Sequence, residues 1–541
     1  MKLSRRVILI IIIFFNFIFS FSEDKIEVYP PYLELEDGMK IPQLPTDDLT
    51  EVDLQGNIIG KRELEKNTTV YLESRVNVFV PLEIISDIDI EAIILDNQKL
   101  KIEKLGRIEK GEIKTNKLMV LCGPNNYGKT QLTYTLYGIY DYNLKFCFKT
   151  EDKKILKENK KIELNIEQIK ERIQKNLPLQ IKNFSENLGI FFNFDSEFFK
   201  NTKLSAEYLE NDFDLELELQ DKRAISLKLA QGQLDVKFDK DSIKIEMLDS
   251  EVENERELIF NFLEERITEI IQKKSFILPS VREGLNMFKT ELNINRNVLI
   301  DTLVAQSQKK GTKTSNFPMS ILFDYVSRYA EPISKYIEFI NDLDMVTSRK
   351  KVGPFNDLAN ELGKIVGGAY VVENGQIYFK PREDKKLKLP LHMVSSTVRS
   401  LAGLYLFLRY EKKLSRVIID EPELNLHPDN QRKIARFLAK IVNKGIQVII
   451  TTHSSYIVQE LNNLIQFKND FAGKEKLKKK YKYCDEEFLD YENVSCYLIE
   501  KGTIEEMEVD RTGIYMKSFN DVINSMNNLA IDLNFEIDKE D

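Results

Sequence analysis

The stretch Lys117-Leu-Met-Val-Leu-Cys-Gly-Pro-Asn-Asn-Tyr-Gly-Lys-Thr130 joins an apolar run to a glycine-rich loop. The apolar run is typical of a buried strand, and residues 131–140 follow with a helical pattern. Gly123–Thr130 satisfies the spacing G-x4-G-K-[ST] in the strand-loop-helix context that this motif requires. The stretch therefore predicts a phosphate-binding loop within an α/β fold.

The chemistry of this loop predicts a site for ATP with Mg²⁺. Glycines let the main chain curl so that several N–H groups face one phosphate, and the helix dipole adds to the attraction. Lys129 would reach the β- and γ-phosphates, and the Thr130 hydroxyl would bind Mg²⁺. The predicted nucleotide-binding residues of the loop are Gly123, Pro124, Asn125, Asn126, Tyr127, Gly128, Lys129 and Thr130.

A second apolar run, Arg416-Val-Ile-Ile, ends in Asp420-Glu421-Pro-Glu. Its three β-branched residues predict a buried strand that presents two acids at its carboxyl end. We expect Asp420 to hold Mg²⁺, directly or through water, and Glu421 to polarise the attacking water. Acidic pairs also end strands in solvated loops, so the assignment depends on the phosphate loop upstream.

A third run, Gln447-Val-Ile-Ile-Thr-Thr-His453-Ser, again predicts a strand that ends in polar residues. The chain has only 3 histidines, so chance placement of one at a strand end is uncommon. A neutral imidazole there would donate to the γ-phosphate, and we predict a catalytic set of Lys129, Glu421 and His453. The alternative is a buried structural histidine.

Length and composition indicate several domains in a non-polytopic protein. The chain has 541 residues, more than one ordinary domain holds. Charged residues make up 30% of it, which argues against a polytopic membrane protein, and the net charge of −9 argues against a generally basic nucleic-acid binder. None of the 4 cysteines lies at metal-ligand spacing, which favours free thiols.

The N-terminal part has a different character. Residues 1–22 carry Lys and Arg before an apolar run at 7–19, the pattern of a secretory signal or of a membrane anchor. Residues 23–97 hold 18 Asp or Glu against 6 Lys or Arg, which predicts an acidic, β-rich or partly disordered extension. Because an exported ATPase would lack ATP, we expect a cytoplasmic protein with possible membrane contact through 7–19, or a fusion or gene-model error in 1–97.

The remaining chain predicts an α/β head with an insert. Strands alternate with helices, which indicates a central mixed sheet flanked by helices. We expect the ATPase head at 98–150 and 275–530, and an inserted α+β subdomain at 151–274.

Asp-Glu-Pro-Glu-Leu-Asn-Leu-His-Pro (420–428) and Thr-Thr-His-Ser (451–454) resemble the ABC-type ATPases of the SMC and overcoming-lysogenization-defect group. Many such proteins carry a generic AAA ATPase label and belong to bacterial anti-phage systems. The resemblance covers about 98–530, and it includes Ile277–Gly284, which looks like the family's Leu-Pro-Ala-Glu-Arg-Ser-Gly. It implies an ATPase, and it suggests that Arg282 lies near the phosphates. Some relatives of the group carry a Toprim nuclease domain, but nothing after residue 460 supplies its acidic cluster, so we expect an ATPase without that domain.

The resemblance also implies a homodimer of heads that sandwich two ATP molecules. A signature serine of one head would touch the γ-phosphate held by the other, and the matching residue here is Ser395. The surrounding Ser-Ser-Thr-Val-Arg-Ser departs from the usual Leu-Ser-Gly-Gly-Gln, and the alternative is an ordinary helix cap. The glutamine that senses Mg²⁺ in this class cannot be placed.

Three functions compete on this evidence. The first is an ATP-driven switch that acts on nucleic acid or on an effector protein. The second is the nucleotide-binding subunit of an ABC transporter, against which stand the roughly 265 residues between Lys129 and Ser395. The third is a membrane-anchored or exported binding protein with decayed motifs. The basic run at 474–480 would contact a nucleic-acid backbone, or it is a solvated loop.

Overall fold

The computed structural model describes most of the chain beyond residue 89. It covers strand segments between 20 and 84, then 90–142, 148–159, 161–219, 275–288, 329–343, 352–411 and 414–515 with single-residue gaps, the strands within 224–248, and a few isolated positions. The described residues fall into two compact units. One comprises 1–95, 144–176 and 213–272, and the other comprises 96–143, 177–212 and 273–541.

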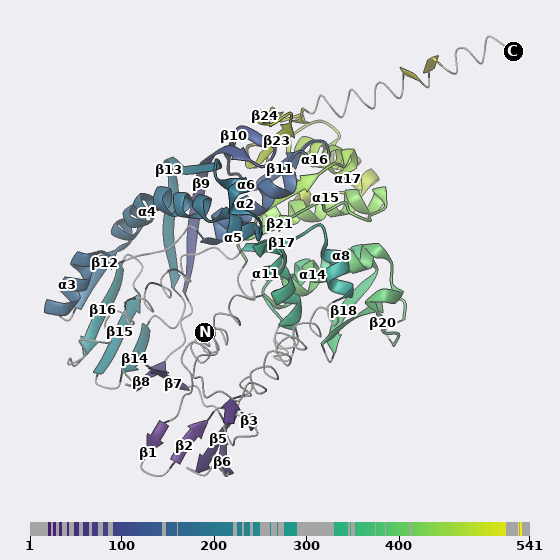
Figure 1. The fold of residues 1–541 in the computed structure, drawn as a ribbon. Helices are drawn as coiled ribbons and strands as arrows, with labels where there is room; N and C mark the ends of the chain where they lie inside the picture. Colours follow the sequence, from purple (N-terminus) through teal and green to yellow (C-terminus); the bar gives the residue numbers. More distant parts are fainter. Residues whose placement is uncertain are drawn as a thin grey trace. The chain divides into compact units, whose positions relative to one another are not determined.

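The second unit, called the head below, is built on a sheet of nine strands (Figure 1). Their spatial order is β13 (Lys203–Leu219), β9 (Ile90–Leu105), β10 (Ile108–Lys114), β24 (Thr503–Met507), β23 (Val494–Glu500), β11 (Leu118–Cys122), β22 (Gln447–Thr452), β21 (Arg416–Ile419) and β17 (Ser275–Leu278). The last five strands pair in parallel, whereas β9 with β10 and β23 with β24 pair antiparallel. The predicted mixed sheet is confirmed.

The parallel pairing brings three strand ends to one edge. Cys122 at the end of β11 lies opposite Thr452 at the end of β22. Ile419 at the end of β21 lies opposite Ile450, two residues before Thr452. Because all three strands run in the same direction, the loops that follow them leave the sheet at its carboxyl edge.

Alternating side chains of these strands fill a separate core on each face of the sheet. On β11, Leu118 and Val120 belong to one core, whereas Met119 and Leu121 belong to the other. Buried on both faces, such strands are continuously apolar, which explains the apolar runs in the sequence.

Helices cover both faces. The core that contains Leu118 is closed by α13 (Asn356–Val366), α14 (Ser396–Tyr410), α15 (Pro428–Asn443) and α16 (Ser455–Lys468). The core that contains Met119 is closed by α2 (Lys129–Tyr142) with α5 (Leu188–Phe192) and α6 (Ser196–Phe199). The head also contains the helices α8 (Arg282–Met287), α11 (Glu331–Asn341) and α17 (Lys474–Tyr481). A small sheet is formed by β18 (Gly368–Glu373), β19 (Gln376–Pro381) and β20 (Leu389–Pro390), and the short strands β25 (Val509–Asp510) and β26 (Gly513–Ile514) pair with each other.

The other unit contains an antiparallel sheet of six strands. Its order is β12 (Lys161–Asn165), β16 (Ser242–Leu248), β15 (Gly232–Phe238), β14 (Ala224–Leu229), β8 (Phe79–Ile84) and β7 (Thr68–Glu73). The helix α3 (Thr150–Asn159) precedes β12, and α4 (Ile166–Glu186) follows it and runs from this unit into the head. A buried ion pair joins Arg172 of α4 to Asp152 of α3 at 2.6 Å.

Short strands make up the described N-terminal part. A four-stranded sheet is formed by β1 (Ser20–Ser22), β2 (Lys25–Val28), β5 (Asp48–Asp53) and β6 (Ile58–Glu63), and β3 (Tyr32–Glu34) pairs with β4 (Lys40–Pro42). The predicted β-rich extension agrees with these strands. The apolar run at 7–19 lies outside the described residues, among which no helix is long and apolar enough to cross a bilayer.

The expected part boundaries differ from the compact units. The boundary at 97/98 falls inside the 16-residue strand β9, and residues 177–212 of the expected insert belong to the head unit. The fourfold division of the chain stays a prediction. The sequence also predicts helices at 252–274 and 290–345, and most of these residues lie outside the described part of the chain.

Candidate functional site

The phosphate-loop motif forms a strained curl between β11 and α2. Gly123 has a φ of 143° and Gly128 one of 97°, and Asn126 between them adopts 67°. A Cβ added to Gly123 would lie 2.1 Å from the carbonyl oxygen of Ile499, so only glycine fits there. The curl exposes Pro124, Asn125 and Asn126, whereas Gly123 is buried.

Lys129 lies inside the curl. Its ammonium donates to the carbonyl oxygen of Gly123 at 3.0 Å and to that of Pro124 at 2.6 Å. The side chain is buried, and burial lowers its pKa, against the raising effect of Glu421 and Asp420. A desolvated ammonium that already sits in the phosphate loop is well placed to meet a phosphate oxygen.

Asp420 joins the loop to the neighbouring strands. Its carboxylate accepts from the Thr130 hydroxyl at 3.1 Å and from the Thr451 hydroxyl at 2.6 Å. The residue is 1% exposed, and burial raises the pKa of its carboxyl despite these two hydrogen bonds. Thr130 and Asp420 are 290 residues apart in the sequence, and the fold brings them into contact as the sequence predicted.

Glu421 occupies a left-handed main-chain conformation, with a φ of 53°. Its N–H donates to the Thr451 hydroxyl at 2.8 Å, and its carboxylate lies 3.1 Å from Nε2 of His453. The hydrogen bond with His453 lowers the pKa of the Glu421 carboxyl, so it is ionised at neutral pH. Both side chains are just under one-third exposed, at 28% and 29%, so water can reach them.

Two residues of this edge were not predicted to have a role. Thr451 bridges the Asp420 carboxylate and the Glu421 N–H. Glu423 accepts from the His453 N–H at 2.6 Å and from the Thr452 hydroxyl at 2.8 Å, and so fixes the turn that carries the histidine. The second acid of Asp-Glu-Pro-Glu and the paired threonines were visible in the sequence, but their partners were not.

Arg282 is bonded to the main chain of the protein, and its expected place near the phosphates stays a prediction. Its guanidinium is 0% exposed and donates to three main-chain carbonyls: Asp420 at 2.7 Å, Glu421 at 2.7 Å and Pro279 at 3.1 Å. The side chain therefore holds the main chain of the acidic turn.

Ser395 is the N-cap of α14. Its hydroxyl accepts from the N–H of Val398 at 3.4 Å, which agrees with the alternative of a helix cap. Ser395 is nevertheless exposed, so the cap leaves its side chain accessible. The next turn is tied to Asn425, whose carbonyl accepts from the Thr397 hydroxyl at 3.1 Å.

The side-chain oxygen atoms at the carboxyl edge of the sheet fit Mg²⁺. The Thr130 hydroxyl and the Asp420 carboxylate supply two hard oxygen ligands within 3.1 Å of each other, and a nearby phosphate would supply more. Mg²⁺ in nucleotide sites keeps most of its ligands from phosphate and water, so a larger acidic cluster is unnecessary.

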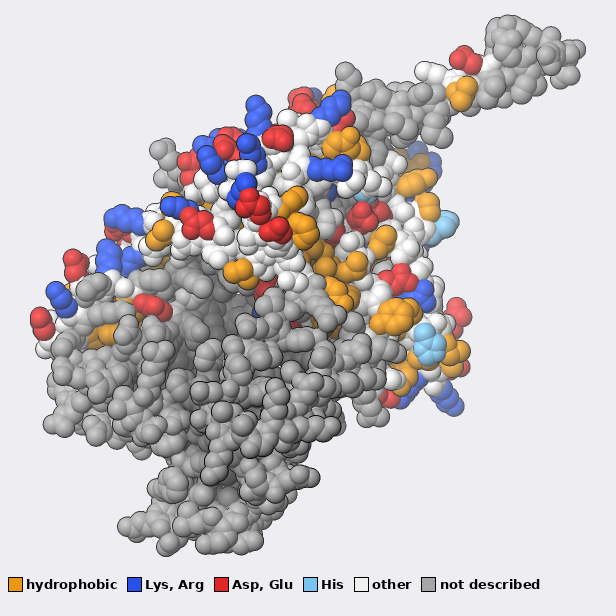
Figure 2. Space-filling view, viewed as in Figure 1, with side chains coloured by type: hydrophobic (Ala, Val, Ile, Leu, Met, Phe, Trp, Pro, Cys, Tyr) orange, Lys and Arg blue, Asp and Glu red, His pale blue; other side chains and the backbone are white. Residues whose placement is uncertain are grey.

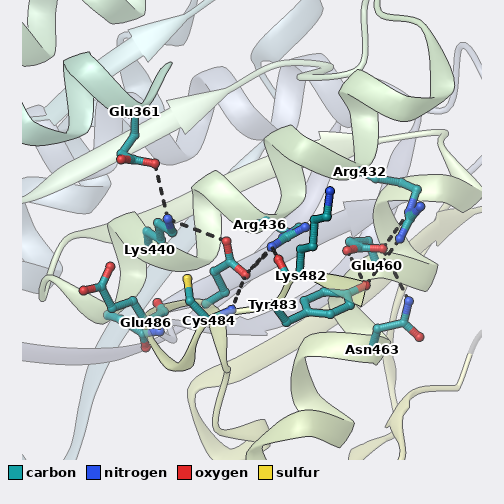
Figure 3. A network of polar contacts seen from close by, with 12 residues as sticks. Glu361, Arg432, Arg436, Lys440, Glu460, Asn463, Lys482, Tyr483, Cys484 and Glu486 are labelled. Carbon is teal, nitrogen blue, oxygen red and sulfur yellow. Dashed lines mark hydrogen bonds and ion pairs between the residues drawn. The ribbon is translucent and has the colours of Figure 1, made fainter. Parts of the chain in front are cut away.

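A second polar cluster lies on one face of α15 (Figure 3). Arg432 pairs with Glu460 of α16 at 2.8 Å, and Arg436 pairs with Glu487 at 2.7 Å. Lys440, one turn further on, reaches both Glu361 and Glu487. Near this face, a cavity of about 910 Å³ is lined by residues of α15, α16, α17 and 511–512.

The basic run forms α17, a short helix without a buried residue, so the run is solvated, as that alternative has it, but it is helical and not a loop. Lys474 pairs with Asp470, and Lys478 pairs with Glu475 and Asp485. On the face that Figure 2 shows, basic and acidic side chains are mixed over the described surface. The described cysteines Cys122, Cys484 and Cys496 are free thiols, as expected.

A mixed α/β sheet whose parallel strands end in a phosphate loop, an acidic turn and a polar turn at one edge defines a P-loop nucleotide-binding protein. A family model described as "AAA ATPase domain" matches residues 98–458. The chain belongs to this family, and it is an ATPase. No curated protein matches the chain.

Solved structures of SMC head domains are similar to the chain. One is the head of Pyrococcus furiosus Smc, with an extended coiled coil and bound to the C-terminal domain of ScpA. It is 12% identical to this chain, with a TM-score of 0.30, and the match covers 81% of this chain and 100% of the Pyrococcus chain. The SMC head of Thermotoga maritima is 12% identical to this chain, with a TM-score of 0.28. The match covers 77% of this chain and 99% of the Thermotoga chain.

Proposed function

We propose that this protein is an ATP-driven switch whose heads dimerise around Mg-ATP and act on nucleic acid or on an effector partner. The observation that carries the proposal is the meeting of Lys129, Thr130, Asp420, Glu421 and His453 at one sheet edge, from three distant segments. Within this set, Lys129, Glu421 and His453 would take part in catalysis.

The geometry suits hydrolysis of a bound triphosphate. The loop N–H groups and Lys129 would bind the β- and γ-phosphates, and Thr130 and Asp420 would hold Mg²⁺, which supplies charge neutralisation. Glu421, ionised and partly exposed, would orient and polarise the attacking water. His453, fixed by Glu423 through its N–H, would contact the γ-phosphate.

Two exposed positions support dimerisation through the nucleotide. Ser395 at the start of α14 and Asn425 after the acidic turn are both exposed and are joined through Thr397. A second head would place its own bound γ-phosphate against Ser395, so that ATP closes the dimer and hydrolysis opens it.

The family resemblance favours anti-phage defence, with a nuclease or toxin supplied by another protein, and a cytoplasmic location where ATP is present. The segment 7–19 stays a predicted membrane contact. An adjacent nuclease or toxin gene would support the defence role, whereas an adjacent permease gene would support transport.

The dimer is tested with the Glu421→Gln variant, which should keep ATP bound. Light scattering after size exclusion should give about twice the monomer mass with Mg-ATP and the monomer mass with Mg-ADP. Ser395→Arg in this background should restore the monomer, whereas Ser205→Arg, at an exposed position of β13, should not. A monomer at saturating ATP would disprove dimerisation, while absent turnover in the unmodified protein would disprove the ATPase.

A further inference from the structure

The short helix α8 contains a buried arginine that the proposed catalytic set does not use. Arg282 is among the largest fully buried side chains, and its guanidinium faces main-chain oxygens. Burying an arginine is costly unless its donors are bonded, so such a residue is kept for what it holds. Its Nε is buried without a hydrogen-bond partner among the described residues.

What Arg282 holds is the turn that carries the candidate base. Non-glycine residues pay about 1 kcal/mol or more for a left-handed conformation, and Glu421 adopts one. Such strain persists only where neighbours fix both sides of the residue. Here the Glu421 N–H is bound by Thr451 and the Glu421 carbonyl by Arg282, both within 2.8 Å. The same guanidinium holds the carbonyl of Asp420.

The next residue, Glu283, connects α8 to the exposed surface at Ser395 and Asn425. Its carboxylate accepts from Nε of Arg399 at 2.7 Å and from the side-chain amide of Asn425. Arg399 in turn donates to the carbonyl of Val394, beside Ser395. Glu283 therefore ties together the two segments at which the proposed dimer would meet.

A second anchor fixes α8 against α14. The amide of Asn286 donates to the carbonyl of Arg399 at 2.9 Å and accepts from the hydroxyl of Tyr336 at 2.8 Å. With Arg282 at its start and Asn286 one turn later, α8 is bonded to the acidic turn on one side and to the first turn of α14 on the other.

We propose that Arg282 is a positioning residue for ATP hydrolysis, which holds Glu421 in its strained conformation, and that Glu283 couples this conformation to the Ser395 and Asn425 edge. The proposal rests on the ATPase role of Glu421. In it, displacement of Arg399 or Asn425 by a second head shifts α8 and, through Arg282, the carboxylate that orients the water. Hydrolysis thereby depends on the closed dimer.

The first test is Arg282→Lys, which keeps the charge but replaces the rigid guanidinium, whose two terminal nitrogens reach three carbonyls, with a single flexible ammonium. We expect kcat to fall about 30- to 100-fold, as for a base misplaced by about 1 Å, with the ATP dissociation constant within about threefold. The matched control is Arg416→Lys, because Arg416 is equally buried and lies on β21, but its guanidinium bonds Gln447 and Ser275 instead of the acidic turn. Its kcat should be unchanged.

The second test asks whether Arg282 acts through Glu421. In the Glu421→Gln background, Arg282→Lys should lower turnover by less than about twofold, because residues that act as a unit are non-additive. A further drop of about tenfold or more would overturn the proposal, as would unmodified turnover in Arg282→Lys alone. Failure of the proposed function itself is distinguishable, because the unmodified protein would then not hydrolyse ATP.

The third test concerns Glu283. Glu283→Gln should leave ATP binding intact but weaken the rise of turnover with protein concentration that dimerisation produces. Glu505→Gln, an exposed carboxylate on β24, is the control. An unchanged concentration dependence in Glu283→Gln would refute the coupling.

Discussion

Two regions of the head bury charged side chains. One is the carboxyl edge of the sheet around Lys129, Asp420 and Glu421, called the nucleotide edge below, and the other is the polar face of α15. The hydrogen-bond partners satisfy these side chains to different degrees in the two regions. At the α15 face, the carboxylate of Glu460 from α16, 0% exposed, is bonded by Arg432 and by the Tyr483 hydroxyl. At the nucleotide edge, Oε2 of Glu423 and Nε of Arg282 are buried without a hydrogen-bond partner among the described residues.

The two regions also differ in charge balance and in strain. Asp420, Glu421 and Glu423 lie within four residues, and burial raises the pKa values of Asp420 and Glu423. At the α15 face, Glu361, Glu460 and Glu487 each meet a basic partner instead (Figure 3). Incomplete hydrogen bonding together with a left-handed Glu421 supports the proposal that the edge is the functional region, and complete pairing is consistent with a structural role for the α15 face.

The largest effect should come from removing the cation of the nucleotide edge. Lys129→Ala should abolish ATP binding, measured by calorimetry, because no other ammonium is bonded inside the phosphate loop in the described chain. Lys117→Ala, at the exposed start of the same segment, should bind ATP normally. Undiminished binding by Lys129→Ala would show that the loop is misassigned.

The next effect should separate binding from chemistry at the same edge. Glu421→Gln should retain ATP but hydrolyse it at least ~100-fold more slowly, because a positioned base contributes about that much. Phosphate release under saturating ATP measures this directly. A turnover equal to that of the unmodified protein would remove Glu421 from the role.

Breaking the α15 face should cost stability without affecting chemistry. Glu460→Ala should lower the free energy of unfolding by about 2 kcal/mol, because it leaves the Tyr483 hydroxyl and Arg432 without their shared acceptor. Denaturant unfolding measures the loss, and turnover below the transition should be unchanged. Lys433→Ala, which removes an exposed pair with Asp429, should cost about 0.5 kcal/mol or less. A large loss of kcat in Glu460→Ala would contradict the comparison.

The smallest effect should have the opposite sign. Asp420→Asn should raise the ligand-free unfolding free energy by about 1 kcal/mol, because it removes a buried charge beside Glu421 that the proposed Mg²⁺ site needs. Its stability should also gain less from added Mg-ATP. Asp357→Asn, which removes an exposed pair with Lys444, should have little effect. A destabilised Asp420→Asn would mean that the edge is as well satisfied as the α15 face.

The sequence by itself determined the phosphate loop, the two strands that follow it in the site, and the identity of Asp420, Glu421 and His453. It could do so because a buried parallel strand is continuously apolar and the motif residues follow it directly. Only the tertiary structure decided that Thr451 bridges two acids, that Glu423 fixes His453, and that Arg282 bonds a main chain 138 residues away. Such contacts depend on which strands become neighbours and on local main-chain angles, and no periodicity along the chain encodes either.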